Sequence, residues 1–192
     1  MILSVARLVE KKGLGDLILA AEILRRQGHC FRVQIIGDGH LRQALEHQVA
    51  DRGLQDCVLL MGAQPHEQVR LAYERASIFV LPCLVAADGD RDGLPIVLLE
   101  AMASGIPVVS TSVVGIPELI DSECDGLLIP PNDARALADA LERLLVNPPL
   151  RDRLARAARA KVEERFSIDR SADRLLDLFI PIEKEKALCL HR

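Results

Sequence analysis

Short apolar runs and longer stretches with spaced apolar residues follow each other in turn along this chain. Runs such as residues 2–6 and Ile78–Leu81 are rich in branched apolar side chains and are typical of buried strands. In residues 14–27, apolar side chains recur every three or four positions, as on one face of a helix, and Gly28 ends the pattern. The alternation predicts an α/β fold, in which a parallel sheet lies between two layers of helices.

The order of the expected elements favours a single domain. We expect strands at residues 2–6, 31–36, 58–61, 78–81, 108–110 and 126–129, and therefore a sheet of about six strands. We expect helices at residues 14–27, 40–52, 67–74, 95–103, 117–120, 134–146, 151–165 and 168–179. Asp133 can cap the helix that follows it, and Asn147-Pro148-Pro149 is expected to break that helix. We assign residues 1–180 to the domain and residues 181–192 to a frayed tail.

Composition argues against several classes of function. The net charge is −4 and aromatic residues make up 3 %, whereas nucleic-acid-binding domains typically show a basic face or stacking aromatic side chains. We therefore expect no nucleic-acid partner. The 5 cysteines are scattered without a C-x-x-C pair, which favours reduced core thiols in a cytoplasmic protein and predicts no metal site. We see no signal peptide, and no apolar run reaches the roughly 18 residues of a membrane span.

Polar and glycine residues follow the carboxyl ends of several expected strands. In open parallel sheets, ligands bind beyond this edge, at the point where the strand order reverses. We therefore expect a binding site there. The residues are Arg7 and Lys12 after the first strand, residues 37–39 after the second, Gly62 after the third, the Asp92 loop after the fourth and residues 111–115 after the fifth.

Asp92 and Glu100 lie eight residues apart, on either side of a Gly-Leu-Pro turn that opens an apolar helix. Pro95 fits the first turn of a helix, and the free N–H groups and dipole at a helix start favour an anion. At about 1.5 Å per residue the two acids lie about 12 Å apart, so a phosphate could lie between them, with a polyhydroxyl group near each. This layout suits the binding of a nucleotide sugar better than it suits hydrolysis of a glycosidic bond. The two catalytic carboxylates of glycosidases lie closer together, roughly 5 to 9.5 Å apart around one bond.

Taken alone, the same residues have simpler interpretations, and these stay open at this point. Arg7 and Lys12 could be solvated surface charges. Asp92 could be an acid favoured by the helix dipole, and Glu100 could simply face water.

Several of these segments resemble, in order and spacing, the donor-binding domain of GT-B retaining glycosyltransferases of family 4, also called group 1. The likeness covers residues 2–179, and the loop of residues 87–95 is most similar to bacterial exopolysaccharide enzymes of the colanic-acid type. The matching segments are Val-Ala-Arg-Leu-Val-Glu-Lys-Lys-Gly at 5–13, the E-x7-E-like stretch at 92–109, Gly-Ile-Pro-Glu-Leu-Ile at 115–120 and Gly-Leu-Leu-Ile-Pro at 126–130.

The resemblance implies a role for each matching residue. Glu100 would accept hydrogen bonds from the ribose hydroxyls, and Asp92 would stand near the anomeric carbon of the donor sugar. The other donor-binding residues would be Arg7 and Lys12 at the diphosphate, Gly93, Leu94 and Pro95 at the sugar hydroxyls or distal phosphate, and Gly62 beside the base. Because the cations and the helix start would stabilise the leaving diphosphate, no metal or other cofactor is expected.

Two residues depart from the family pattern. Asp92 replaces the usual Glu, so its carboxylate reaches one methylene less far. Val114 stands where many members have the first Gly of a Gly-Gly pair, which weakens the expectation that this loop approaches the donor closely.

The family's enzymes consist of two Rossmann-like domains that face a cleft, and this chain matches only the second. The resemblance therefore implies the donor-binding half of a retaining enzyme that moves a sugar from a nucleotide sugar to a glycan or lipid-linked acceptor in exopolysaccharide synthesis. We expect the N-terminal acceptor domain to be missing and this half alone to be inactive. The missing domain would give the enzyme a peripheral position at the inner membrane face. Half of a sugar epimerase or ADP-sugar glucan synthase, or a non-catalytic nucleotide-sugar-binding module, remain as alternatives.

Overall fold

A six-stranded parallel sheet forms the centre of the molecule, with the strand order β3-β2-β1-β4-β5-β6. The structure is a computed structural model that describes residues 1–166. This strand order is that of the doubly wound dinucleotide-binding fold, and it confirms the predicted fold class. The strands are β1 (Ile2–Val5), β2 (Val33–Ile36), β3 (Val58–Gly62), β4 (Ile78–Leu81), β5 (Val108–Thr111) and β6 (Leu127–Ile129).

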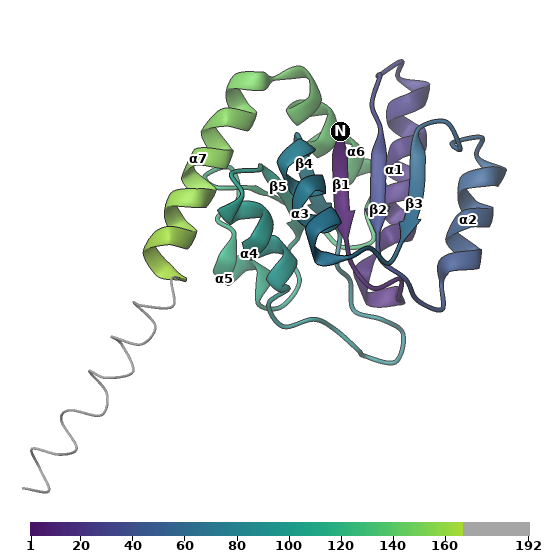
Figure 1. Cartoon of the computed structure of the whole chain (residues 1–192), viewed down its shortest axis with the longest axis horizontal. Coiled ribbons are helices and arrows are strands. Elements are labelled where there is room, and N and C mark those ends of the chain that lie inside the picture. Colours follow the sequence, from purple (N-terminus) through teal and green to yellow (C-terminus); the bar gives the residue numbers. More distant parts are fainter. Residues whose placement is uncertain (167–192) are drawn as a thin grey trace, which may run out of the picture.

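Helices cover both faces of the sheet (Figure 1). One face carries α1 (Leu14–Arg26), α2 (Arg42–Asp51) and α6 (Ala134–Val146). The other carries α3 (His66–Arg75), α4 (Ile96–Ala103) and the short α5 (Ile116–Leu119). The last described helix, α7 (Pro148–Arg165), packs against both α4 and α6.

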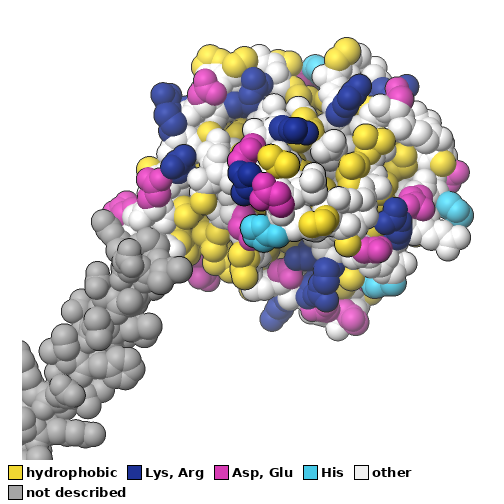
Figure 2. All heavy atoms as spheres, viewed as in Figure 1, with side chains coloured by type: hydrophobic (Ala, Val, Ile, Leu, Met, Phe, Trp, Pro, Cys, Tyr) yellow, Lys and Arg dark blue, Asp and Glu magenta, His cyan; other side chains and the backbone are white. Residues whose placement is uncertain are grey.

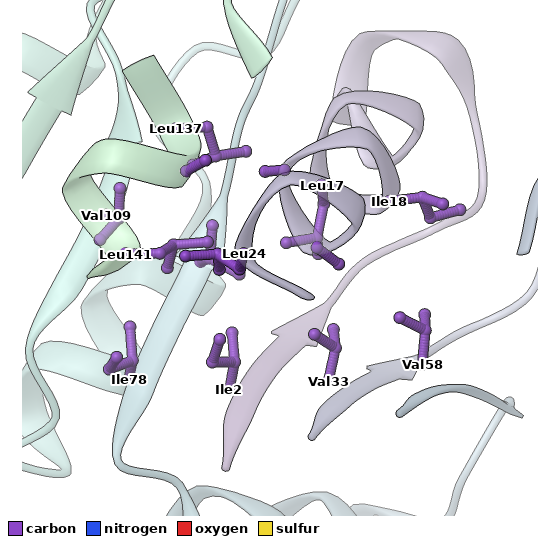
Figure 3. Close-up of a cluster of buried hydrophobic side chains, with 14 of the residues drawn as sticks. Ile2, Leu17, Ile18, Leu24, Val33, Val58, Ile78, Val109, Leu137 and Leu141 are labelled. Atoms are coloured by element: carbon purple, nitrogen blue, oxygen red, sulfur yellow. The ribbon is translucent and has the colours of Figure 1, made fainter. Parts of the chain in front are cut away.

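The side chains of the central strands β1 and β4 alternate between the two layers, which is why these strands read as mainly apolar runs. Ile2 and Ile78 point into the layer of α1 and α6, whereas Leu3 and Phe79 point into the layer of α3 and α4. Burial of each such side chain contributes about 1.5–3 kcal/mol of transfer free energy. Figure 3 shows the first layer, in which Leu17, Ile18 and Leu24 of α1 and Leu137 and Leu141 of α6 lie over Ile2, Val33, Val58, Ile78 and Val109 of the sheet.

The junction of α6 and α7 differs in part from the expectation. Asp133 caps α6 as predicted, because its Oδ1 accepts the N–H of Ala136 at 2.8 Å. Asn147-Pro148-Pro149 ends α6, but it also begins α7 rather than lying in a loop before it. The Oδ1 of Asn147 accepts the N–H of Leu150 at 3.0 Å. The two prolines occupy the first helical positions, where a missing N–H costs no hydrogen bond.

Two further expectations fall outside what the structure describes, namely the helix at 168–179 and the tail at 181–192. In residues 1–166, no helix combines the length and the apolar character needed to cross a membrane. The face in Figure 2 shows acidic and basic side chains interspersed rather than one basic patch.

Candidate functional site

The strand order reverses between β1 and β4, and the loops that follow these two strands meet there. The carboxyl ends of the strands point to the lower edge in Figure 1, where the long β4–α4 loop lies. Gly13, at φ 62°, packs so closely on this loop that an added Cβ would lie 1.8 Å from the carbonyl oxygen of Pro82. The N–H of Leu84 donates to the carbonyl of Lys11 at 2.9 Å. The first and fourth strand ends are thus joined through their backbones.

A cluster of lysine and aspartate side chains occupies this junction. Lys12 Nζ lies 2.7 Å from Asp92 Oδ2, and Lys11 Nζ lies 3.0 Å from Asp90 Oδ1 and 3.7 Å from Asp92 Oδ1. The Lys12 and Asp92 side chains are only 11 % and 15 % exposed. The hydrogen bond from Lys11 and, more weakly, the charge of Arg7 lower the pKa of Asp90. The two lysines are therefore already held by carboxylates.

Cys83 lies against the same cluster but is not poised as a nucleophile. Its thiol donates to Asp92 Oδ2 at 3.5 Å. Burial, together with the charge of Asp92, raises the pKa of Cys83 to about 12. A thiol with that pKa stays protonated at neutral pH, and the thiolate is the nucleophilic form.

The start of α4 lies beside this cluster. Pro95 is the residue before the helix, rather than its first residue as expected, and no side chain caps the helix. The first-turn N–H groups of such a helix lack intrahelical partners, so they can bind an anion. Gly93 and Leu94, just before the helix, are exposed at its entrance.

The β5–α5 loop lies directly against Gly93. A Cβ added to Gly115 would lie 3.1 Å from the carbonyl oxygen of Gly93. Val114 adopts a φ of 41°, in the left-handed region that a β-branched residue rarely enters. The loop therefore keeps a conformation suited to glycine although Val114 replaces the usual Gly.

Glu100, on α4, lines a groove of about 500 Å³ together with residues of α3 and with Gln64, which follows β3. Glu100 Oε2 accepts a hydrogen bond from the hydroxyl of Tyr73 at 3.0 Å. Arg70, the arginine of this groove, is paired with Glu67 at 2.7 Å and with Glu74 on its own helix. Arg70 is therefore not free to pair with Glu100, and the charges in and around the groove are negative in excess.

A second groove, of about 450 Å³, shares Gln64 and Val69 with the first and continues to Arg7 at the end of β1. Gly62 ends β3 beside it, and its carbonyl accepts the N–H of Gly37 at 2.9 Å. Arg7 is exposed and also borders Lys11 and Asp90. Lys12 and Asp92 line neither groove, because their ion pair is mostly buried.

The structure thus brings the predicted residues to one edge of the sheet but in two groups. Arg7, Lys12, Asp92 and the α4 start lie at one end, and Glu100 and the segment after Gly62 lie at the other. Lys11 and Tyr73 also belong to the site, although neither is among the residues predicted from the sequence. Lys11 could have been found as the neighbour of Lys12, and Tyr73 as the single tyrosine of the chain. In the described part, no cluster of three or more metal-ligating side chains occurs.

The sequence profile of the family described as glycosyl transferases group 1 matches residues 1–161. The chain belongs to this family. This domain is 51 % identical over 166 residues to the amylovoran biosynthesis glycosyltransferase AmsK of Erwinia amylovora, and 45 % identical over 170 residues to the putative colanic acid biosynthesis glycosyltransferase WcaL of Escherichia coli. Each match covers 86 % of this chain and 41 % of the relative. The group 1 domain therefore spans about two fifths of the length of these relatives.

Solved structures share the fold of the group 1 domain. The crystallised C-terminal domain of the group 1 glycosyl transferase LpcC of Francisella tularensis has a TM-score of 0.77 at 24 % identity, and the match covers 87 % of this chain and 86 % of that one. Anabaena HepE in complex with UDP-glucose has a TM-score of 0.80 at 20 % identity, over 94 % of this chain and 48 % of that one. The predicted identity, a GT-B C-terminal domain related to exopolysaccharide glycosyltransferases, is confirmed.

Proposed function

We propose that this group 1 domain binds a nucleoside-diphosphate sugar along the carboxyl edge of its sheet. We further propose that the whole protein transfers the sugar, with retention of configuration, to a glycan or lipid-linked acceptor in exopolysaccharide synthesis. The observation that carries the proposal is the division of the site. Lys12 and the start of α4 lie at one end. Glu100 lies at the other end, in a groove whose arginine, Arg70, is already paired.

The cationic end suits the diphosphate. Arg7, Lys11, Lys12 and the uncapped start of α4 all face the junction of the first and fourth strand ends. During transfer, negative charge develops on the leaving diphosphate, and fixed positive groups at that point lower the barrier. Once the diphosphate displaces Asp90 and Asp92 from the lysines, the lysines and Arg7 would take the role that a metal would otherwise have.

The Glu100 groove suits the nucleoside, which carries no charge. Its arginine is neutralised by two glutamates, so a phosphate would gain little there. We assign Glu100 to the ribose hydroxyls and the segment from Gly62 to Gln64 to the border of the base. A protein whose structure contains the same fold, HepE, has been solved with UDP and with UDP-glucose, which supports a nucleotide sugar as the ligand.

Asp92 is assigned to the donor sugar. It follows the cationic end in the chain and precedes Gly93 and Leu94, whose backbone we assign to the sugar hydroxyls or distal phosphate. Its carboxylate is bonded to Lys12. Donor binding would therefore require this ion pair to exchange for a lysine–phosphate pair.

We place the acceptor site outside this chain, in an N-terminal domain, and expect the chain alone to be inactive in transfer. The shorter length of the chain relative to AmsK and WcaL supports this division. We also propose a cytoplasmic location, with contact to the inner membrane face through the rest of the protein. The four cysteines of the described part are unpaired, as in a reducing compartment.

Calorimetric titration of the purified chain with ADP-, GDP-, UDP- and CDP-sugars tests the proposal. We expect one of them to bind, and Lys12→Ala to weaken that binding about 10- to 100-fold, since hydrogen bonds to charged groups contribute about 1.5–3 kcal/mol. Arg156→Ala, which removes one positive charge from an exposed position on α7, is the matched control and should leave the affinity nearly unchanged. A folded chain that binds none of these donors would contradict the proposal.

A further inference from the structure

Tyr73 is held from two sides in the wall of the Glu100 groove. Its ring is stacked on Phe79 of β4, with ring centroids 5.7 Å apart and an interplanar angle of 30°. Its hydroxyl donates to Glu100 Oε2 at 3.0 Å and lies 3.4 Å from the carbonyl oxygen of Val97. The residue is only 6 % exposed, and it lines the groove together with Glu100.

The hydroxyl of Tyr73 has one hydrogen, and both of its neighbours are acceptors. The shorter contact is to Glu100, and a charged acceptor forms the stronger hydrogen bond. Burial and the charge of Glu100 raise the pKa of Tyr73 above its ordinary value, so the hydroxyl remains a donor throughout the neutral range.

Glu100 itself is exposed and has a long, flexible side chain. A free glutamate would lose side-chain entropy when a ligand fixes it. The bond from Tyr73 fixes one oxygen in advance. A carboxylate has about four lone-pair positions, so the remaining positions on the two oxygens can still accept from two neighbouring hydroxyl groups.

The charge of Glu100 is also left available for such hydroxyl groups. Arg70, on the next turn of α3 from Tyr73, is paired with Glu67 and Glu74 instead. The Glu100 carboxylate is therefore already oriented by Tyr73, and it can accept hydrogen bonds from a neutral ligand that carries two neighbouring hydroxyl groups.

Resting on the proposed function, we infer that Tyr73 is a positioning residue that aims Glu100 at the ribose and thereby makes this domain select ribonucleotides over 2′-deoxyribonucleotides. Tyr73 acts through Glu100 and does not itself contact the reacting atoms. A tyrosine with only a packing role would be replaced by phenylalanine without any change in this selection.

The test compares Tyr73→Phe with the natural chain, using ADP, GDP, UDP and CDP and their 2′-deoxy counterparts in calorimetric titrations. The natural chain should prefer the ribose form of its nucleotide by about 10-fold or more, because a hydrogen bond to a charged group contributes about 1.5–3 kcal/mol. Tyr73→Phe keeps the ring and its stacking on Phe79, and should reduce this preference at least about 5-fold by weakening the ribose form. Glu100→Ala should abolish the preference, and Tyr73→Phe should then have no further effect on it.

Ser110→Ala is the matched control for loss of a buried hydroxyl. Ser110 donates to the carbonyl of Leu81 at 2.6 Å and lines neither groove. It should lower the melting temperature without changing the ribose preference.

A second measurement needs no substitution at position 73. The chain has 1 tyrosine and no tryptophan, so its tyrosine fluorescence reports Tyr73 alone. A hydrogen bond to a carboxylate quenches this emission, so Glu100→Ala should raise it.

The inference is overturned if Tyr73→Phe retains the ribose preference, if the natural chain binds both sugar forms equally, or if Glu100→Ala leaves the fluorescence unchanged. Failure of the natural chain to bind any of these nucleotides, seen without any variant, would instead overturn the proposed function on which the inference rests.

Discussion

The Asp92 carboxylate and a donor diphosphate would compete for the same ammonium group. Lys12 Nζ lies 2.7 Å from Asp92 Oδ2, in a pair that is mostly buried. Partly buried ion pairs are less screened by salt than surface pairs, so the competition should be measurable at physiological ionic strength. The acid assigned to the sugar therefore also sets how readily the diphosphate reaches Lys12.

We expect Asp92→Asn to bind the nucleoside diphosphate more tightly than the natural chain does, by about 3- to 10-fold, because the amide no longer neutralises Lys12. Calorimetric titration measures the change. Asp88→Asn removes the same charge from the same loop, and its carboxylate bonds only the N–H of Asp90 among the described residues, so it should have little effect. Weaker diphosphate binding by Asp92→Asn would show that Asp92 orients Lys12 instead of competing for it.

Val114 illustrates strain at a position beside the site. Its φ of 41° costs a β-branched residue roughly 1–2 kcal/mol, whereas glycine loses roughly 0.5–1 kcal/mol in conformational entropy. Val114→Gly should therefore raise the free energy of unfolding by up to about 1 kcal/mol, measured by urea denaturation. The control is Val85→Gly, since Val85 is a similarly exposed loop valine without a positive φ. If Val114→Gly and Val85→Gly destabilise the protein equally, the backbone at Val114 is not strained.

At the scale of elements, one lysine ties α7 to the segment between α5 and β6. Lys161 Nζ lies 2.8 Å from Asp121 Oδ2 and 2.7 Å from Asp125 Oδ2. Lys161 and Asp125 are 8 % and 7 % exposed, whereas Asp121 is open to solvent. A buried charge that loses its partner is costly, so this contact decides how firmly α7 is held.

We expect Lys161→Met to lower the free energy of unfolding by about 3 kcal/mol, because it removes the only cation bonded to the buried Asp125 carboxylate in the described residues and leaves it the N–H of Asp121 alone. Arg159→Met removes the cation of an exposed pair with Glu163 on the same helix and should cost less than about 0.5 kcal/mol. Urea denaturation at pH 7 measures both. If the two variants lose similar amounts of free energy of unfolding, the buried ion pairs of Lys161 do not stabilise the fold more than an exposed pair does.

The same contact predicts how stability depends on pH. The hydrogen bond and charge of Lys161 lower the pKa of Asp121 below its ordinary 3.8, so this stabilisation is present above pH 3.8 and is lost as pH falls through the lowered pKa. Burial lowers the pKa of Lys161, but the bonds to Asp121 and Asp125 outweigh it and raise the pKa above 10.5. That contribution is present below pH 10.5 and is lost as pH rises through the raised pKa. In Lys161→Met, the free energy of unfolding should therefore change less with pH, both at the acidic and at the alkaline end.

The elements could be predicted well because their signals are local. The apolar runs end at glycine, proline or polar residues, so the expected strand at Ile78–Leu81 and the helix at Ala134–Val146 agree with the structure. The start of α7 was misplaced because two prolines usually indicate a break, and only the Asn147 cap shows that they begin a helix.

At the scale of the whole molecule, the strand order assembles the site. A parallel sheet covered on both faces follows from the alternating pattern, but the pattern does not state which strands are neighbours. Because β1 lies beside β4, Lys11 meets Asp90, 79 residues away in the chain. The packing of α3 beside α4 likewise brings Tyr73 to Glu100, 27 residues away.

The sequence by itself determined the fold class, the elements and the residue types at the carboxyl edge, and its motifs indicated the family, because these depend on periodicity and on residues close together in the chain. Only the tertiary structure decided which side chains touch. It showed that Asp92 is bonded to Lys12, that Glu100 is held by Tyr73, and that these contacts lie at separate ends of the site. The physical reason is that side-chain pairing depends on the order of the strands and the packing of the helices, which no local pattern encodes.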